Sequence, residues 1–146
     1  MKIMQTRFGE VEYDPALILH FPEGLIGLDQ LRHFIVVPNK KPGPLFWIQC
    51  VDDPAFAFVL TDPTNFFLDY IIQPNDNERQ KLGIDAQSDC FVVTTVSISE
   101  EKEITLNLAA PILYAPTTNR ALQVVLDDPR YDTRTPLPKI ENKASC

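Results

Sequence analysis

Hydrophobic and polar side chains alternate with a period of two over several short stretches of the chain, and this alternation predicts β-strands. Phe46, Ile48 and Cys50 fall on one face of the first such stretch. The same pattern recurs over residues 56–60, 103–109 and 122–126. Residues 91–98 are β-branched and aromatic enough for a buried strand, and the polar segment 99–102 predicts a hairpin loop after it.

Helical signals are few and short. Residues 76–82 predict a helix, because Asn75 or Asp76 can cap its N-terminus and Gly83 can end it. We also expect residues 29–33 to form a single helical turn. Many short strands with proline-rich connections predict a mainly β fold, namely a small, closed or nearly closed antiparallel β-barrel-like domain with one or two short helices.

A turn between two apolar runs, residues 21–28, carries no catalytic side chain but displays aliphatic ones. Pro22 presets the first corner of the turn, and Gly24 can supply a positive φ. Leu25 and Ile26 follow where a simple connection would be polar. Two interpretations are open: the turn packs back onto the core, or it forms an edge at which a partner docks.

Length and composition predict one domain. The chain has 146 residues, 45% of them apolar, and 13 prolines against 5 glycines, which indicates short and stiff connections. We expect a single β domain over residues 1–138. The polar tail, residues 139–146, is expected to be disordered.

Charge and cysteine usage narrow the class of protein. A formal charge of −7 and a pI near 4.7 disfavour nucleic-acid binding, which needs a basic surface. No apolar run approaches the length of a membrane span, and the N-terminus lacks an apolar secretion core. Cys50, Cys90 and Cys146 are odd in number and widely spaced, as expected for free thiols. These features predict a cytoplasmic protein.

Candidate catalytic and metal-ligating residues are scarce. His20 and His33 have no cysteine or acidic residues at a ligand spacing, so we expect no metal. A thiol nucleophile at Cys50 or Cys90 would need a histidine brought near by folding, and buried cysteines more often serve as small hydrophobic residues. The acidic pairs at 52–53 and 127–128 precede prolines and are assigned turn roles. We therefore expect no enzyme and no cofactor, but a binding protein.

Several segments together resemble the FliW family of flagellar assembly factors. They lie in the family's order and spacing, from the N-terminal strand to about Leu137. Leu28 departs from the pattern, since an aromatic residue is common there. The segments are residues 21–28, 62–63, 67–70, 107–112, 123–126 and 131–137.

The resemblance implies a small, non-enzymatic cytoplasmic protein with a β-barrel-like fold. Such proteins bind flagellin before export, and they also bind CsrA, a small RNA-binding dimer that represses flagellin translation. The two interactions exclude each other, and CsrA is antagonised away from its RNA-contacting surface. An acidic domain would attract a basic partner, and exposed aliphatic residues could receive the amphipathic terminal helices of flagellin. We expect a monomer with no direct contact to nucleic acid or membrane.

Six residues are candidates for partner contact. Asn107 and Gln123 have a second interpretation, in which they bind backbone groups near a strand end. The other residues of the turn at 21–28 are expected to shape the fold. If residues 66–67 lie on a strand, the side chains of Phe66 and Phe67 point to opposite faces. Phe66 would then contact a partner and Phe67 would be buried. The six candidates are Leu25, Ile26, Phe66, Asn107, Pro111 and Gln123.

Two rival functions remain at this stage. A β-barrel with 9 phenylalanines could carry a small apolar ligand in its interior, although small barrels normally fill that space with their own side chains. A thiol-dependent enzyme would require a reactive Cys50 or Cys90.

Overall fold

The computed structural model describes residues 1–37 and 42–138, and the predicted tail at 139–146 lies outside this part of the chain. The described residues form eleven strands, one α-helix and two short 3₁₀ helices. The strands are β1 Lys2–Thr6, β2 Gly9–Tyr13, β3 Leu19–His20, β4 His33–Val37, β5 Leu45–Cys50, β6 Ala57–Thr61, β7 Phe91–Ile98, β8 Ile104–Leu106, β9 Ile112–Ala115, β10 Arg120–Gln123 and β11 Thr135–Pro136. The helices are η1 Pro15–Leu17, η2 Pro63–Asn65 and α1 Asp76–Leu82.

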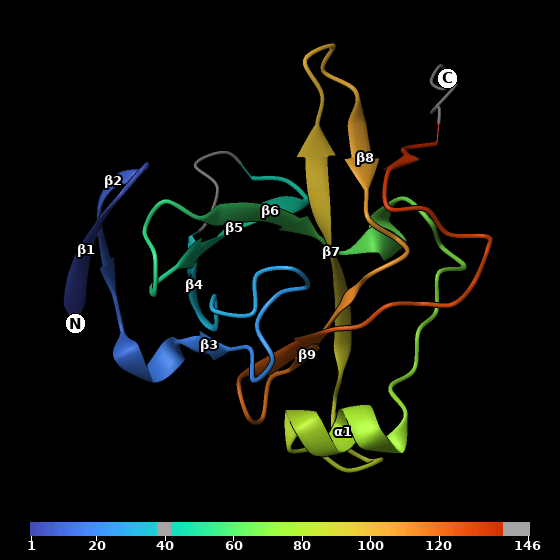
Figure 1. Ribbon diagram of the computed structural model, residues 1–146, viewed down its shortest axis with the longest axis horizontal. Coiled ribbons are helices and arrows are strands. Elements are labelled where there is room, and N and C mark those ends of the chain that lie inside the picture. Colours follow the sequence, from blue (N-terminus) through green and yellow to red (C-terminus); the bar gives the residue numbers. More distant parts are fainter. Residues whose placement is uncertain (38–41, 139–146) are drawn as a thin grey trace.

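Seven strands form a nearly closed ring, as the alternation predicted. Hydrogen bonds join them in the order β7, β6, β5, β4, β3, β10 and β9, and β9 pairs again with β7. All neighbours in the ring are antiparallel except β3 and β10, which are parallel and share the single register pair His20–Arg120. The β1–β2 hairpin stands outside the ring, and β8 and β11 extend from the upper half of β7 (Figure 1).

Three apolar clusters stabilise this ring, and the third of them packs Leu82 of α1 against Leu113 of β9 and Leu122 of β10. The first is centred on the fully buried rings of Phe21 and Phe34, whose centroids lie 5.2 Å apart, and it includes Leu25 from the turn. The second is built on Val96 and Leu106, and the segments 66–72 and 126–137 pack against it. The Tyr70 hydroxyl donates to the Leu108 carbonyl at 2.7 Å, which fixes the first of these segments to the chain just after β8.

The helix α1 begins and ends where the sequence predicted. The Asn75 side chain accepts from the Glu78 N–H, and the Glu78 side chain accepts from the Asn75 N–H, which is a complete capping box. Gly83 ends the helix with a φ of 72°.

The predicted helical turn at residues 29–33 is wrong. The Leu31 N–H donates to the Leu28 carbonyl, but the Phe21 N–H then donates to the Arg32 carbonyl, and His33 begins β4. Pairing with β3 therefore extends the backbone here, because tertiary hydrogen bonds outweigh a weak local helical preference.

Two strands end earlier than predicted. The hairpin at 99–102 and the strand at 91–98 are confirmed, but β8 ends at Leu106 and β10 ends at Gln123. An arch over residues 107–111 causes the first difference. The Asn107 N–H still donates to the Thr95 carbonyl, and pairing with β7 resumes only at Ile112.

Candidate partner-binding groove

The turn at residues 21–28 is a rigid double reversal. Gly24 and Gly27 have φ values of 69° and 79°, as the sequence predicted for the first of them. Leu25 and Leu28 form a small antiparallel bridge, with N–O distances of 3.3 and 2.8 Å. Leu25 is only 5% exposed, whereas Ile26 is 53% exposed. The interpretation that the turn packs onto the core is thus confirmed for Leu25, while Ile26 points to solvent.

Gln123 connects this turn to the arch after β8. Its side-chain Oε1 accepts from the Ile26 N–H at 2.9 Å, and its Nε2 donates to the Ala110 carbonyl at 3.0 Å. The Asn107 side chain in turn accepts from the Ala110 N–H at 3.0 Å. Asn107 and Gln123 therefore bind backbone groups, as one of the two interpretations held. Contact with a partner stays a prediction for both.

The buried Pro111 completes this arrangement, because its carbonyl accepts from the Val124 N–H at 3.0 Å. Five of the six candidate residues are thus brought together by hydrogen bonds or by adjacency in the turn and the arch. Only Ile26 among them presents a large exposed side chain. Of the other four candidates, three belong to the turn and the arch, and Gln123 joins the two and holds the backbone of Ile26 in place.

A hollow of about 470 Å³ lies beside this turn, and we call it the turn groove. One wall is the turn itself with Gln123, and the other is formed by β5, β6 and the end of β7. Ile26 on one wall and Ile98 on the other are 53% and 57% exposed. Apolar side chains therefore border the groove on both sides, and the wall formed by the turn is held in place by the hydrogen bonds of Gln123.

Phe66 does not lie in the turn groove, and the strand assumed for residues 66–67 is absent. Phe66 follows η2, which Asp62 caps, and the Phe67 N–H donates to the Pro63 carbonyl. Both rings are half-buried against the second cluster. The expected contrast between an exposed and a buried phenylalanine therefore has no basis. The exposed side chain of this segment is Leu68, which is 87% exposed.

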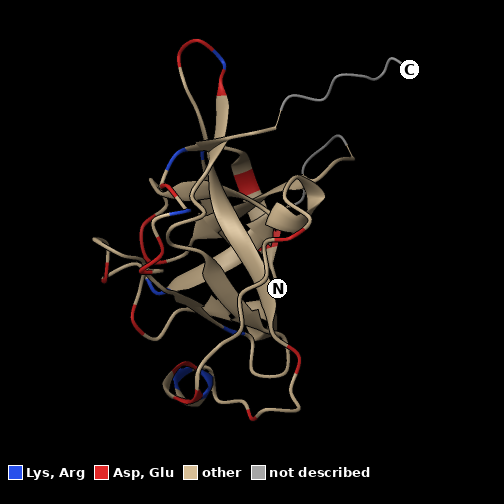
Figure 2. Cartoon of the chain, turned by 90° about the vertical axis from the view of Figure 1, so that its right-hand side faces the viewer, with Lys and Arg blue, Asp and Glu red and all other residues tan. Residues whose placement is uncertain are grey.

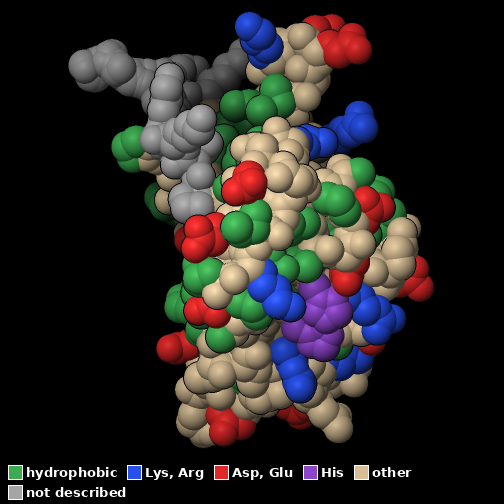
Figure 3. Space-filling view, turned by 90° about the vertical axis from the view of Figure 1, so that its left-hand side faces the viewer, with side chains coloured by type: hydrophobic (Ala, Val, Ile, Leu, Met, Phe, Trp, Pro, Cys, Tyr) green, Lys and Arg blue, Asp and Glu red, His purple; other side chains and the backbone are tan. Residues whose placement is uncertain are grey.

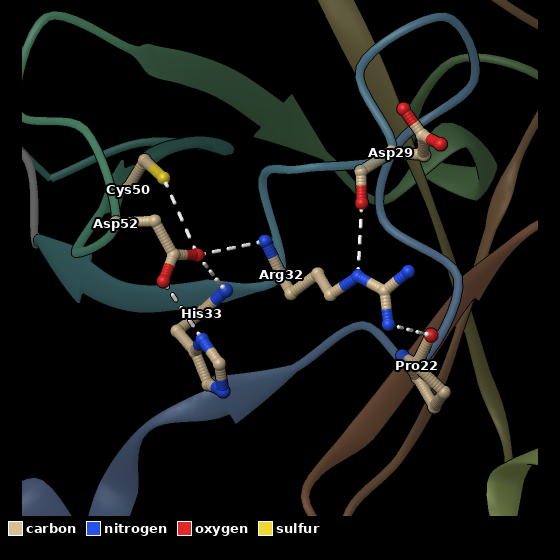
Figure 4. A network of polar contacts seen from close by, with 6 residues as sticks. All are labelled: Pro22, Asp29, Arg32, His33, Cys50 and Asp52. Carbon is tan, nitrogen blue, oxygen red and sulfur yellow. Dashed lines mark hydrogen bonds and ion pairs between the residues drawn. The ribbon is translucent and has the colours of Figure 1, made fainter.

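A polar cluster that no local sequence pattern indicates lies where β3 pairs with β4. The rings of His20 and His33 stack with centroids 5.1 Å apart and an interplanar angle of 7°. Asp52 accepts from the Arg32 and His33 N–H groups at 2.8 Å each, and its other oxygen lies 2.9 Å from His33 Nδ1 (Figure 4). Asp53 has the predicted turn role, because its side chain accepts from the Ala55 N–H at 3.0 Å. Asp52 instead joins segments that are 20 residues apart in the sequence.

Burial opposes the ionised form of Asp52, but the hydrogen bonds from Arg32 and His33 outweigh it and hold the pKa of this carboxyl below its usual range. The Cys50 thiol lies 4.0 Å from the same carboxylate, and burial raises the pKa of Cys50. Burial also raises the pKa of Cys90. Both shifts disfavour a thiolate nucleophile. Among the residues that the structure describes, no group of three or more side chains could hold a metal ion.

The position of His20 predicts a pH-dependent stability. Burial, followed by the charges of His33, Arg120 and Arg32, lowers the pKa of His20 below its ordinary value of 6.5. The unfolded chain then binds more protons than the folded one, so the free energy of unfolding falls as the pH decreases below 6.5. Between about pH 7.5 and 5.5, we expect the free energy of unfolding measured in urea to fall less for His20→Gln than for the wild type. An identical loss in both proteins would contradict this.

The interior of the ring offers little room for a ligand. An apolar cavity of about 160 Å³ lies next to Leu17 and is lined by core residues such as Ile48 and Leu60. Pockets that hold small-molecule ligands usually measure roughly 300–1,000 Å³. The core side chains therefore fill most of the space that a carrier would need.

The fold defines a small, mainly β protein whose seven-stranded ring carries a groove bordered by exposed aliphatic side chains. A family model described as FliW protein matches residues 2–137, and the chain belongs to this family. The FliW family is a family of flagellar assembly factors and not of enzymes, so this chain is a flagellar assembly factor.

Relatives and a solved structure agree with this assignment. The chain is 57% identical over 141 residues to flagellar assembly factor FliW 2 of Desulfotalea psychrophila, covering 97% of this chain and 93% of that protein. It is 58% identical over 137 residues to flagellar assembly factor FliW of Syntrophotalea carbinolica, covering 94% and 98%. A crystal structure of the flagellar assembly factor FliW superimposes with a TM-score of 0.84 at 27% identity, covering 94% of this chain and 98% of that one. Within the described residues no helix is long and apolar enough to cross a membrane.

Proposed function

We propose that the chain binds flagellin in the cytoplasm and, when free of flagellin, binds and antagonises CsrA away from the RNA-contacting surface of CsrA. Flagellin translation is thereby coupled to flagellin export. The observation that carries this proposal is the turn groove, which is bordered by exposed Ile26 and Ile98 and is fixed by Gln123. An amphipathic terminal helix of flagellin is the partner that such a groove fits, because its apolar positions recur on one face.

An acidic projection beside the groove supports the second interaction. The β7–β8 hairpin stands out from the ring and carries Glu100, Glu101 and Glu103 against Lys102 (Figure 2). Its base includes Ile98, which lines the groove. A basic protein such as CsrA is attracted to this hairpin, and its attachment there covers one wall of the groove. The two partners then exclude each other by overlap, and relative affinity and concentration decide which is bound.

Competition between purified proteins tests this proposal. We expect labelled CsrA to bind the chain and to be released as unlabelled flagellin is added, with the released fraction following the flagellin concentration. Fluorescence anisotropy gives both affinities, and gel filtration separates the complexes. A stable ternary complex would contradict mutual exclusion, and binding of neither protein would contradict the proposed function as a whole.

A further inference from the structure

A second surface of the molecule concentrates positive charge where β3 meets its two neighbours. His20 on β3 pairs in register with His33 on β4 and with Arg120 on β10. The two imidazole rings are stacked, and Lys and Arg side chains border them on the surface (Figure 3). Together with Arg32 we call these residues the histidine–arginine cluster.

The two guanidinium groups of the cluster have no acidic partner in the part of the chain that the structure describes. Arg32 donates from Nε to the Asp29 carbonyl at 2.9 Å and from Nη1 to the Pro22 carbonyl at 3.0 Å, while the Asp29 carboxylate points away (Figure 4). Among the described residues, the Arg120 guanidinium group donates to the Lys81 carbonyl alone, at 3.4 Å. Neither arginine forms an ion pair within residues 1–37 and 42–138. Backbone carbonyls thus orient these side chains without neutralising them.

The acidic residues nearby are already engaged. Asp52 accepts from two backbone N–H groups and from the His33 ring. Glu23 lies 3.0 Å from the Lys81 ammonium group. Asp52 is thus held by backbone N–H groups and the His33 ring, and Glu23 pairs with Lys81, so neither carboxylate pairs with Arg32 or Arg120. Two guanidinium groups that form no ion pair with a described residue therefore lie on this face of a chain whose net charge is −7.

We propose that His20, Arg32 and Arg120 form a docking site for a carboxylate side chain in an acidic peptide segment of a partner protein. Two oriented guanidinium groups and an imidazole are donors that suit a carboxylate. The fixed carboxylates of Asp52 and Glu23 at the margins repel a doubly charged phosphate more strongly than a singly charged carboxylate. An acidic peptide is therefore the ligand class, in preference to phosphate or a nucleic-acid backbone.

Binding at this site is linked to protonation. The groups that face His20 are His33, Arg120, Arg32 and Asp52. A carboxylate placed beside the two arginines offsets their repulsion of an imidazolium, so binding favours the protonated form of His20. By linkage the affinity for the acidic peptide increases as the pH decreases.

The test uses a blocked peptide in which glutamate alternates with serine, and a peptide with glutamine in place of glutamate as the ligand control. The chain has 2 histidines, so NMR signals of the imidazole rings report binding directly. We expect saturable shifts with the glutamate peptide and none with the glutamine peptide. Arg120→Gln and Arg32→Gln each lower the affinity by about tenfold or more, since a charge-assisted hydrogen bond is lost.

Arg134→Gln is the matched control, because it removes the same charge from an exposed residue outside the cluster. Thermal unfolding shows whether each variant is folded. Because there are two cluster variants, the test can still be made if one of them does not fold. Equal affinity in the cluster variants and in Arg134→Gln would overturn the proposal, as would the absence of saturable shifts. Tighter binding of inorganic phosphate than of the peptide would overturn the ligand class. No flagellar protein is used, so this test is independent of the proposed function.

Discussion

Gly24→Ala is expected to lower the free energy of unfolding by about 3 kcal/mol, combining a left-handed backbone penalty of roughly 1–2 kcal/mol with partial exposure of Leu25. Gly24 has a φ of 69°, and an added Cβ would lie 2.5 Å from the Asp29 Cα and 2.6 Å from the Asp29 carbonyl oxygen. Both atoms belong to the backbone, so the turn itself must move. Urea unfolding followed by circular dichroism measures the loss.

Gly27→Ala is the matched control, three residues further along the same turn. Gly27 also has a positive φ, of 79°, but apart from its two chain neighbours no described residue lies within 4 Å of the position of its Cβ. This variant therefore carries only the backbone penalty, roughly 1–2 kcal/mol. If the two alanine variants were equally stable, the close approach of Asp29 to Gly24 would have no energetic role.

Ile26→Asp is expected to weaken flagellin binding by about 100-fold, because a charge would be placed at the centre of an apolar contact and about 2.7 kcal/mol would be lost. Ile26 is 53% exposed, and only its backbone N–H is engaged, with Gln123. The stability of the free chain should therefore change by less than about 0.5 kcal/mol. Fluorescence anisotropy with labelled flagellin measures the affinity.

Leu17→Asp provides the control for this variant. Leu17 is 69% exposed and belongs to η1, and it does not line the turn groove. The substitution adds the same charge to a comparable exposed aliphatic residue. It should leave flagellin affinity within about twofold of the wild type, since surface changes away from an interface have small effects.

The ring could be predicted from the sequence because its strands alternate clearly. Phe46, Ile48 and Cys50 all face the first cluster, as their spacing indicated. The capping box at Asn75 is also a local signal, since its two members lie three residues apart. The failed helix at 29–33 shows the limit of such signals, because Asp52 and Phe21 supply the hydrogen bonds that extend this segment.

The site could be predicted only in part, because hydrogen bonds between segments far apart in the sequence bring its residues together. Gln123 and Ile26 are 97 residues apart, and no local pattern indicates that they bind each other. Both were candidates separately, as a lone polar residue in an apolar strand and as an aliphatic residue in a turn. The stacked histidines gave no such signal, because His20 and His33 meet only when β3 pairs with β4.

The measurement that tests the central claim most directly is the equilibrium affinity of purified flagellin for the wild-type chain, Ile26→Asp and Leu17→Asp under the same conditions. The turn groove as the flagellin site predicts tight binding to the wild type and to Leu17→Asp, and a loss of about 100-fold for Ile26→Asp alone. Equal affinity for all three proteins would place flagellin elsewhere on the surface. No binding to the wild type would contradict the proposal that this flagellar assembly factor holds flagellin.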